Sequence, residues 1–463
     1  MTRFGKVLQQ PARVAGAVAI LCAAALVAPL PAAAQETVSL EQALRTALTL
    51  NPNIESAGAA AAAATSSRWA DWGAFLPTAD VRGILSQTDF TTVTFVDPTG
   101  VSQTLDDPIT ATRKSSSASL SFGLALLNPE RISNVKSGAA RENAAEFRLT
   151  AAERVVIRDV KRSYFEALKQ TQLLEVSQRQ LGARRQDFEV TRQRYRIAAA
   201  SRSDLLGAEM DLSDAEIRVL DSEDALSRAL RQLQVTLGVP VTDTDLGSIG
   251  VIDVDRVPDA APLNADALVV SALAANPNLL ALREDRRAAS SDLWSAKATY
   301  LPRIDIGYTF GRSKELGRDE SLLDFSPANT SDGFVISGSW NLFSGFTRKR
   351  QTAQADQQQR QAAAQLTAQQ LQLEKDVRDL VKELKRRSQR LTILDRNVQL
   401  AGERLELSRE QYRLGSIPYF NLQQAIDRLT LTEQSLFQER YDYLIGWANL
   451  EEKVGGDLST GAS

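Results

Sequence analysis

The chain contains one pattern of residues twice. Asn51-Pro52-Asn53 recurs as Asn276-Pro277-Asn278, 225 residues later. Tyr195-Arg196 recurs as Tyr412-Arg413, 217 residues later. The spacing shrinks by eight residues between these landmarks, so one connection is longer in the first copy. A repeat of this length predicts one structural unit built twice, and any fold assigned to the chain has to be a duplicated one.

Residues 1–34 are predicted to be a secretory signal. Three basic residues precede an apolar run from Val14 to Leu30, and Ala32-Ala33-Ala34 follows, as at a signal cleavage site. A transmembrane anchor is the alternative, but the run is short and prolines interrupt its end. Lipid attachment at Cys22 is a further alternative, although bulky Leu21 stands where such signals need a small residue.

Composition argues against catalysis. Cys22 is the only cysteine and the chain has no histidine, so the mature part offers no thiol nucleophile, imidazole base or soft metal ligand. We therefore expect no enzyme activity, no metal site and no cofactor. Without the three basic residues of the signal the net charge becomes −6, a mild value that argues against nucleic-acid binding. No mature segment is apolar over about 18 residues, so the sequence predicts no membrane-spanning helix.

Each copy has the pattern of two short helices, two strands, a long helix and a return helix. Asn51 and Asn276 predict helix caps, each followed by a proline at the first helical position. Leu76-Pro77 and Leu301-Pro302 predict the entry into extended chain. The predicted repeats span 35–240 and 264–455, joined by a linker at 241–263 and followed by a tail at 456–463. Their expected elements are strand pairs at about 79–127 and 303–343, long helices at about 133–197 and 347–414, and return helices at about 203–237 and 418–454.

The expected strands alternate large apolar with small or polar residues. Leu120, Phe122, Leu124 and Leu126 form one such series, Ile304, Ile306, Tyr308 and Phe310 a second, and Phe334, Ile336, Trp340 and Leu342 a third. The strand near Val81–Leu85 has the weakest pattern, and Asp97–Pro108 and Ser313–Ser331 are expected to be connections. This alternation fits a transmembrane barrel wall, and it fits a half-buried soluble sheet equally well.

The long helices carry apolar residues seven apart, which is the coiled-coil spacing. The two series are Val160, Ala167, Leu174, Leu181, Phe188 and Tyr195, and Val377, Leu384, Leu391, Val398, Leu405 and Tyr412. Leu380, Leu394 and Ala401 fill the intermediate position in the second copy, whereas the first copy has small or polar residues there. Each helix would be roughly 100 Å long at about 1.5 Å per residue, so the shorter helices should pack on it end to end.

Four strands per chain cannot close a barrel, since small barrels need about eight, and lipid does not tolerate an open sheet edge. A membrane location therefore requires an oligomer. Two chains would give eight strands and three would give twelve. Because a barrel of about eight strands is filled by side chains, an open pore favours three chains.

These features resemble the TolC-type outer membrane efflux protein family. The resemblance extends from Leu40 to Gly455 and includes the doubled Asn-Pro segments and the Leu-Pro strand entries. It also includes the paired segments Tyr195–Leu206 and Tyr412–Leu422, and Tyr441-Asp442-Tyr443-Leu444 near the end. No single motif is specific, but all of them occur in order in both copies.

The resemblance implies a mainly α-helical, internally duplicated homotrimer with a twelve-stranded barrel in the lipid of the Gram-negative outer membrane. A long helical tunnel would cross the periplasm and meet a periplasmic adaptor (membrane fusion) protein, which links it to an inner-membrane pump or ABC transporter. The chain would be the passive exit duct of this three-part machine. The turns at 196–204 and 413–421 would be the tips that open.

The resemblance also places functional residues. The tip or gate set is Tyr195, Arg196, Ser203, Asp204, Tyr412, Arg413, Gly415, Asn421 and Gln424, and the adaptor-docking set is Ala198, Ala199, Ala200, Arg202, Ser416 and Ile417. Three departures from the family pattern matter. Ala198 replaces a usual glycine, neutral Asn421 and Gln424 stand where some members have aspartate rings, and Ile417 stands where those members have an arginine. An ionic lock at the tip is therefore not carried over, and gating is expected to depend on Tyr412, Arg413 and Asp204.

Several features have a structural and a functional interpretation. The arginines near the first tip (Arg179, Arg184, Arg185, Arg192, Arg194, Arg196 and Arg202) are either a docking collar or, more often in such helices, a solvated coiled-coil flank. Tyr195 and Tyr412 are expected to be core residues rather than gate residues, and Trp69 and Trp294 to be packing residues. Trp340, Tyr308 and Tyr300 fit an aromatic belt or simple barrel packing.

The sequence thus predicts an export duct, with a periplasmic coiled-coil scaffold without a pore as the alternative. The scaffold would explain the signal and the heptads, but it would not explain strands placed symmetrically before both long helices. Small-molecule efflux is favoured as the activity, and type I protein secretion is possible with the same architecture. The absence of histidine and of a Met-rich stretch makes a copper or silver duct an unfavourable prediction.

Overall fold

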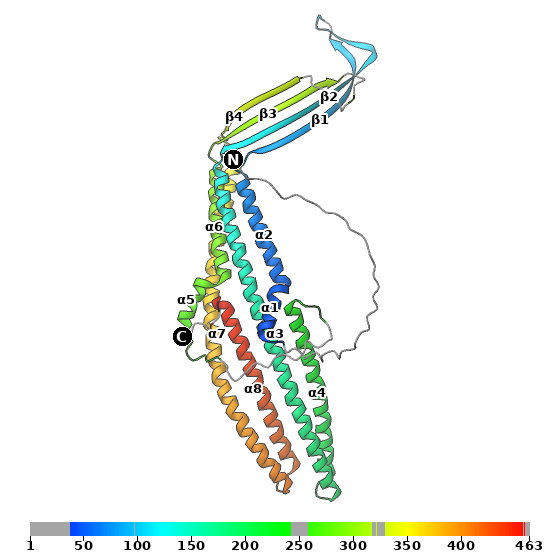
Figure 1. Ribbon diagram of the computed structural model, residues 1–463, viewed down its shortest axis with the longest axis vertical. Coiled ribbons are helices and arrows are strands. Elements are labelled where there is room, and N and C mark those ends of the chain that lie inside the picture. The colour runs from blue at the N-terminus through cyan, green and yellow to red at the C-terminus, as the bar shows by residue number, and fades with distance from the viewer. Residues whose placement is uncertain are drawn as a thin grey trace, which may run out of the picture.

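The computed structural model describes residues 38–96, 98–241, 258–316, 321, 329–456 and 458. The predicted signal, most of the predicted linker and most of the predicted tail lie outside these residues. The described part is elongated: helices form a long shaft, and a four-stranded sheet stands at one end of it (Figure 1).

The same order of elements occurs in both halves. The first half contains α1 (Leu40–Leu50), α2 (Pro52–Gly73), β1 (Thr78–Val96), β2 (Ser102–Leu127), α3 (Pro129–Arg196) and α4 (Arg202–Leu237). The second contains α5 (Ala265–Ala275), α6 (Pro277–Ala298), β3 (Arg303–Leu316), β4 (Asn329–Ser339), α7 (Thr347–Arg413) and α8 (Tyr419–Val454). Shifting α1 and α2 by 225 gives the bounds of α5 and α6, and shifting α4 by 217 gives those of α8. The duplication is therefore confirmed.

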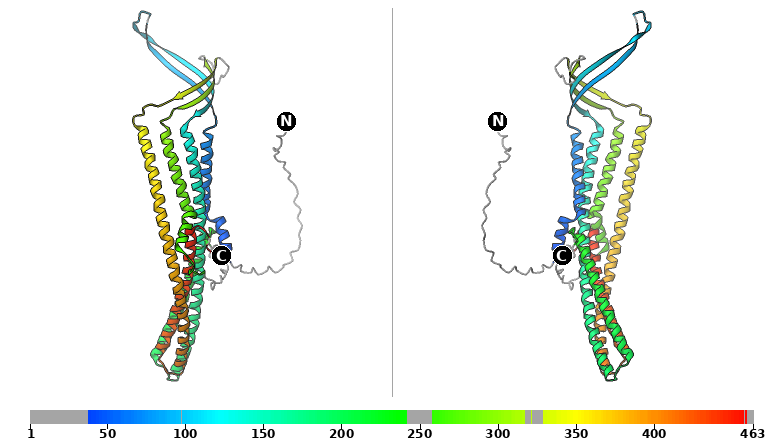
Figure 2. Two further views of the ribbon diagram at one scale, coloured as in Figure 1. Left: turned by 90° about the vertical axis from the view of Figure 1, so that its left-hand side faces the viewer. Right: turned by 90° about the vertical axis from the view of Figure 1, so that its right-hand side faces the viewer.

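Each long helix packs against two shorter helices that meet end to end. α3 lies beside α2 near the sheet and beside α4 near the far end, and α7 lies beside α6 and α8 in the same way (Figures 1 and 2). α3 of the first half also packs against α6 and α8 of the second half. α2, α4 and α7 are therefore the outer helices of the wall, with α3, α6 and α8 between them.

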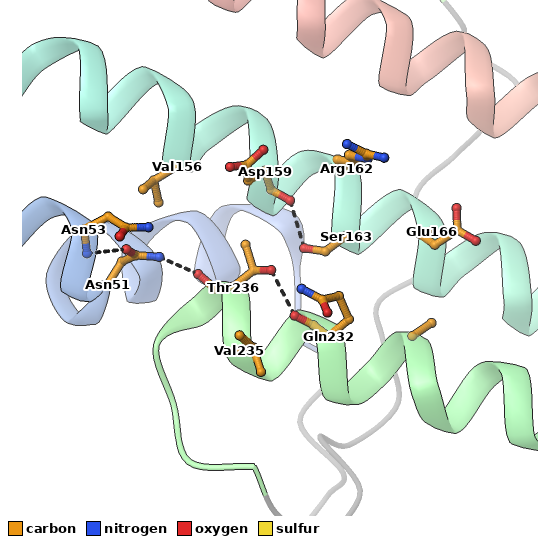
Figure 3. Close-up of a pocket in the computed structure, with 11 residues that line it drawn as sticks. Asn51, Asn53, Val156, Asp159, Arg162, Ser163, Glu166, Gln232, Val235 and Thr236 are labelled. Atoms are coloured by element: carbon orange, nitrogen blue, oxygen red, sulfur yellow. Dashed lines mark hydrogen bonds between the residues drawn. The ribbon is translucent and has the colours of Figure 1, made fainter.

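Two asparagines join the short helices. The Asn51 side chain caps α2 by accepting from the Asn53 N–H, and its amide donates to the Thr236 carbonyl at 2.8 Å (Figure 3). Asn276 caps α6 and donates to the Lys453 carbonyl at 3.0 Å. Both predicted caps are confirmed, and the amides add a link to the ends of α4 and α8.

Glycine is required beside each of these joints. Gly238 has φ +77°, and a Cβ there would lie 2.5 Å from the Leu50 carbonyl oxygen. Gly455 has φ +82°, and a Cβ there would lie 2.8 Å from the Ala275 carbonyl oxygen. These left-handed caps let the return helix end directly against the short helix of its own repeat.

The core is divided into three clusters along the shaft. One contains buried residues of α5, α6, α7 and α8, a second joins α1, α3, α4 and α8, and a third lies near the far end. Of the heptad residues, Val160, Ala167, Val377, Leu384, Leu405 and Tyr412 are buried. At the intermediate position of α3 the buried residues are Ser163, Ser177 and Arg184, so polar groups enter the wall there.

The sheet has the order β1-β2-β3-β4, and all neighbouring strands are antiparallel. Val81 pairs with Leu120, Leu120 with Phe310, and Phe310 with Asp332. β1 and β4 each have one edge without a partner among the described residues. The sheet therefore ends in two open edges, one beside α2 and the other beside α7.

The strands differ from the sequence prediction at their ends. β1 is 19 residues long although its pattern is weak, because its backbone pairs with β2 along nearly its whole length. The connection expected at Asp97–Pro108 is shorter, since residues 102–108 already belong to β2, and Asp97 itself lies outside the described residues. β3 continues to Leu316 and β4 begins at Asn329, which shortens the second connection, most of which is not described.

β4 ends earlier than its alternating pattern predicts. Trp340 and Leu342 follow the last strand residue, Ser339, because the chain turns toward α7 there. Gly345 and Phe346 both have positive φ in this turn. Within the described ranges, no single helix has the length and apolar character to cross a membrane, and the pair α5 and α6, bent by 46°, passes by length and composition only.

Candidate functional site at the helical tips

Both tips are short turns of the same backbone shape. In the first, the Ala199 N–H donates to the Arg194 carbonyl at 2.8 Å, and in the second the Ser416 N–H donates to the Gln411 carbonyl at 2.9 Å. The residue before each donor is left-handed: Ala198 has φ +58° and Gly415 has φ +75°. The replacement of glycine by Ala198 thus keeps the turn but puts a side chain into a conformation that L-residues disfavour.

The two tip tyrosines have different environments. Tyr412 is buried, and its hydroxyl shares a hydrogen bond of 3.1 Å with Thr191 Oγ1. It also packs edge to face with Tyr419 at 5.8 Å between ring centroids. Tyr195 is 41% exposed. Within one copy, Tyr412 is therefore a core residue as expected, and the same expectation is wrong for Tyr195.

Two of the predicted gate residues have local structural contacts. Asp204 accepts from the Ser201 backbone N–H at 3.1 Å and, with the Ser201 side chain, forms the capping box of α4. Arg413 pairs with Glu410 on its own helix. Asp204 therefore stabilises the start of α4.

The remaining predicted tip residues lie at the surface or on the edge of the tip cluster. Arg196, Ala198, Ala199, Arg202, Ser203, Gly415, Ser416, Asn421 and Gln424 are exposed. Ala200 and Ile417 are half-buried, and Ile417 packs against the buried cluster that contains Tyr412 and Leu422. The exposed residues form a largely uncharged end surface, apart from Arg196 and Arg202.

Arg194 connects the two tips. Its guanidinium donates to the Tyr412 carbonyl at 2.5 Å and to the Ala199 carbonyl at 3.4 Å. It also stacks over the Tyr412 ring, 4.5 Å from the centroid. One side chain of α3 thus holds the end of α7 and the turn of its own hairpin, so moving the tips apart requires these contacts to break.

A buried polar cluster lies behind the tips. Arg184 of α3 is only 4% exposed and donates to Asp211 of α4 at 3.3 Å and to Asp427 of α8 at 2.6 Å. Asp211 also accepts from the Tyr419 hydroxyl at 3.0 Å and from the Gln423 amide at 2.8 Å. The cluster ties three helices together, and breaking it would leave the charge of Arg184 or Asp211, both largely buried, without its ionic partner.

Two titratable groups beside this cluster have raised pKa values, chiefly because they are buried. Burial raises the pKa of the Asp187 carboxyl, and the nearby cations Arg409 and Arg184 oppose this effect while Asp211 adds to it. One carboxylate oxygen of Asp187 has no hydrogen-bond partner among the described residues. Burial, followed by the charge of Asp211, also raises the pKa of Tyr419, so this phenol stays neutral and donates to Asp211.

Sequence reasoning missed most of these contacts. Arg194 and Arg184 were grouped with the surface arginines, and Thr191, Asp211 and Asp427 were not singled out. One signal was present: Arg184 occupies the core-facing intermediate heptad position, where the second copy has Ala401. A charged residue at such a position predicts a buried ion pair, because an unpaired buried charge is costly.

The arginine-rich flank is mostly engaged within the chain. Arg179, Arg185 and Arg192 pair with Glu175, Glu216 and Glu189, and Arg184 and Arg194 make the contacts described above. Only Arg196 and Arg202 of the seven have no ion pair or side-chain hydrogen bond with the described residues. This pattern agrees better with a coiled-coil flank than with a docking collar.

Trp69 of α2 and Trp294 of α6 are largely exposed in a single copy. Trp69 is 72% exposed and Trp294 is 61% exposed. Their expected packing role is therefore wrong for a single copy, because most of each side chain is exposed. Trp340 donates to the Tyr300 carbonyl at 3.0 Å, and Tyr300, Tyr308 and Trp340 are all exposed near the start of the sheet.

A polar pocket of about 540 Å³ lies at the joint of α2 and α4 (Figure 3). Asn53, Asp159, Arg162, Glu166 and Gln232 line it, together with the Asn51 cap. No group of three or more metal-ligating side chains occurs among the described residues. The pocket contains both acidic and basic groups and no arrangement for a defined reaction.

A duplicated helical shaft that carries an open antiparallel sheet is the fold of outer membrane channels with solved structures. The model of the outer membrane efflux protein family matches residues 43–239 and 268–456, which cover most of the chain. The chain therefore belongs to the outer membrane efflux protein family, as its sequence suggested.

The individual relatives agree. The chain is 23% identical over 338 residues to the alkaline protease secretion protein AprF of Pseudomonas aeruginosa, covering 73% of this chain and 69% of AprF. It is 22% identical over 343 residues to the outer membrane protein TolC of Vibrio cholerae, covering 73% and 76%. The outer membrane channel CmeC of Campylobacter jejuni has the same fold, with a TM-score of 0.76, 14% identity and coverage of 91% and 88%.

The chain is accordingly an outer membrane channel protein of a Gram-negative bacterium, and its helical shaft lies in the periplasm. Its family consists of channel proteins rather than enzymes. The periplasmic scaffold without a pore is no longer a viable alternative. The cargo, the partners and the roles of the tip residues are treated as proposals below.

Proposed function

We propose that three copies of the chain form one exit duct, which receives cargo from a periplasmic adaptor protein and an inner-membrane pump. The observation that carries this proposal is the sheet with two open edges, β1 and β4. Pairing β4 of one copy with β1 of the next satisfies every edge, and three copies close a barrel of twelve antiparallel strands. Two copies would give eight strands, and side chains fill the interior of a barrel of about that size.

The internal repeat predicts how the helices of neighbouring copies meet. Within one chain, α3 packs against α6 and α8. The equivalent of α3 is α7, and the equivalents of α6 and α8 are α2 and α4. Because α7 lies at one side of the wall and α2 and α4 lie at the other, we propose that α7 packs against α2 and α4 of the next copy.

The ion pairs of the inner seam have no counterparts at the proposed contact between copies. The seam inside the chain contains ion pairs between Lys161 and Glu451 at 2.5 Å and between Arg184 and Asp427 at 2.6 Å. The positions equivalent to the second pair are Ala401 and Met210, which are neutral. None of the equivalents of the other ion pairs between α3 and α6 or α8 contains an acidic residue. These equivalents are Arg378 with Gln234, Lys375 with Val235, Arg386 with Ala225, Gln358 with Ser67, and Gln365 with Ala60.

Apolar residues stand on both proposed contact faces instead. On α7 and the turn after it, Ile393, Leu400, Leu407 and Leu414 are exposed and seven residues apart. On α4, Leu206, Met210, Ile217 and Leu220 are exposed. Stripes of this kind on a single helical surface indicate a partner helix, because burying each such side chain contributes about 1.5–3 kcal/mol.

We further propose that the tips are the gate of the duct. The gate would be held by Arg194 on the Tyr412 carbonyl, by the Thr191–Tyr412 hydrogen bond and by the buried polar cluster around Arg184. Exposed Asn421 and Gln424 would face the opening without charge, and Ala199, Arg202 and Ser416 would meet the adaptor. Opening then requires α7 and α8 to move away from α3.

Small-molecule efflux is the proposed activity, on the strength of the family match. A second candidate, protein export, is favoured by the similarity to AprF, which is named a protease secretion protein. We propose no cargo-binding pocket in the duct, because a passive channel leaves cargo selection to the pump.

Deletion and complementation test both activities. Retention of a fluorescent efflux substrate is measured in cells without this chain and in cells complemented with it, and the culture medium is compared for exported proteins. Retention that rises on deletion and returns on complementation supports efflux. Unchanged retention with a protein missing from the medium supports secretion instead. If neither readout changes while the chain is present in the outer membrane, the export proposal fails.

A further inference from the structure

A groove of about 500 Å³ lies between α6 and α7, away from the tips. We call it the basic groove. Its polar lining consists of Arg283, Arg286, Arg287, Ser290 and Ser291 of α6 and Gln370 of α7. The five α6 residues lie within about two turns and on one helix face, because residues three, four, seven and eight apart in a helix share a face.

The charge in the basic groove is not balanced. Arg283 donates to the Leu273 carbonyl at 2.7 Å, and Arg287 pairs with buried Glu284. Arg286 is exposed and has no ion pair or side-chain hydrogen bond among the described residues.

The other acidic residues of α6 point elsewhere. Asp285 pairs with Arg148 at 2.5 Å and Asp292 pairs with Arg141 at 2.6 Å, and both arginines belong to α3. The groove therefore combines three guanidinium groups with one carboxylate, and its α7 side offers a neutral amide.

The internal repeat argues that packing does not require these arginines. The positions of α2 equivalent to Arg283, Arg286 and Arg287 are Gly58, Ala61 and Ala62. α2 packs on α3 as α6 packs on α7, and it does so with small side chains. One half of a duplicated wall thus has arginines where the other half has none.

We propose that the basic groove is a binding site for an anionic group, a phosphate or a carboxylate. Guanidinium groups bind both in a bidentate manner, and the Ser291 hydroxyl and the Gln370 amide add donors around the same space. The Ser290 hydroxyl already donates to the Arg286 carbonyl at 3.0 Å. A lipid headgroup is the wrong source. Arg287 lies 11 residues before the end of α6 at Ala298, so roughly 16 Å of helix separates it from the start of the sheet.

Binding to the purified full-length mature protein in detergent tests the site. Inorganic phosphate, citrate and a fluorescent hexaglutamate peptide are titrated separately at constant ionic strength. The test variant is Arg286→Ala with Arg287→Ala, which copies Ala61 and Ala62 of the first repeat. The control is Arg350→Ala, which removes one exposed arginine of α7 that has no side-chain partner among the described residues.

We expect the test variant to bind at least one of the three probes about tenfold or more weakly than the wild type, with little change in the control. Tighter binding of phosphate or citrate than of the peptide indicates a free anion as the ligand. Tighter binding of the peptide indicates an anion carried by a macromolecule.

Equal binding by wild type and test variant, or an equal loss in the control, overturns the site. Thermal unfolding confirms that both variants remain folded. Because no readout depends on transport, failure here leaves the export proposal untouched.

Discussion

Ala198 and Gly415 occupy the same place in the two tip turns, and both are left-handed, yet only one is a glycine. A left-handed conformation costs an L-residue about 1–2 kcal/mol, and glycine avoids this cost but loses more chain entropy on folding. We therefore expect Ala198→Gly to stabilise the shaft by about 0.5–1 kcal/mol. Gly415→Ala should destabilise it by about 1 kcal/mol.

Thermal unfolding followed by circular dichroism measures both effects. A Cβ on Gly415 would lie 3.5 Å from a nitrogen of Arg194, which is an ordinary contact, so the expected loss comes from the backbone. Opposite shifts in the two variants support this reasoning. Shifts of the same sign would mean that the tips do not respond to backbone strain.

The stability of the tip region should depend on pH through Asp187, and the raised pKa of its carboxyl gives the sign. Its pKa is raised in the folded protein, chiefly by burial, so the protonated form is favoured by folding. The contribution of this group to stability is fully present below its unfolded pKa and is lost as the pH rises through the raised value. Asp187→Asn should therefore make the shaft more stable at neutral pH and remove this part of the pH dependence.

Asp379 is the matched control for this measurement. Its exposed carboxyl has a lowered pKa, first because of the hydrogen bond from Lys375 and then because of the charge of Lys375. Its contribution is present above its unfolded pKa and is lost as the pH falls. Unfolding between pH 3 and pH 8 should thus change in opposite directions in Asp187→Asn and Asp379→Asn. A stability curve of Asp187→Asn that parallels that of the wild type would contradict the argument.

At the level of elements, Arg184 joins α3 to α4 and α8. Arg184→Ala should destabilise the far end of the shaft by about 3–5 kcal/mol, because Asp211 and Asp427 would lose their buried cation. Arg185→Ala is the control, since Arg185 pairs with Glu216 at the surface at 3.5 Å and should contribute below about 1 kcal/mol.

The proposed gate gives this pair of variants a functional readout. Cells that carry Arg184→Ala should admit a large hydrophilic antibiotic that the outer membrane normally excludes, because the duct would no longer close. Cells that carry Arg185→Ala should stay resistant. Equal sensitivity in the two strains, with equal amounts of protein in the membrane, would remove Arg184 from the gate.

The sequence predicts helices here better than strands or side-chain contacts. Heptad spacing and the caps at Asn51 and Asn276 place the helices within a few residues, because both are local patterns. The ends of β1 and β2 are not local, since backbone pairing extends both strands through residues without alternation.

The tip contacts could not be predicted from the sequence, for a similar reason. Tyr412 and Thr191 lie 221 residues apart, and only the packed hairpins bring them together. Even so, the charged residue at the core-facing position 184 was a readable sign of a buried ion pair.

On the scale of the whole molecule, the proposed trimer rests on the two open edges of the sheet. We expect a cysteine in β4 of one copy to form a disulfide with a cysteine in β1 of the next. The mature protein is suited to this test because the only cysteine of the full sequence, Cys22, lies in the predicted signal. Val335→Cys in β4 is combined in turn with single cysteines at positions 79–85 of β1, because the register between copies follows from barrel closure and not from one chain.

Oxidised outer membranes are then separated by size under denaturing conditions. At least one pair should give a covalent ladder that stops at three copies, whereas each single cysteine should give none. Leu120→Cys with Phe310→Cys is the control, since these residues are paired within one chain and should link without an increase in size. A disulfide requires Cα atoms within about 7 Å, so linkage reports direct strand pairing. A ladder that stops at two copies, or β1–β4 linkage within single chains only, would exclude the twelve-stranded barrel and the duct built on it.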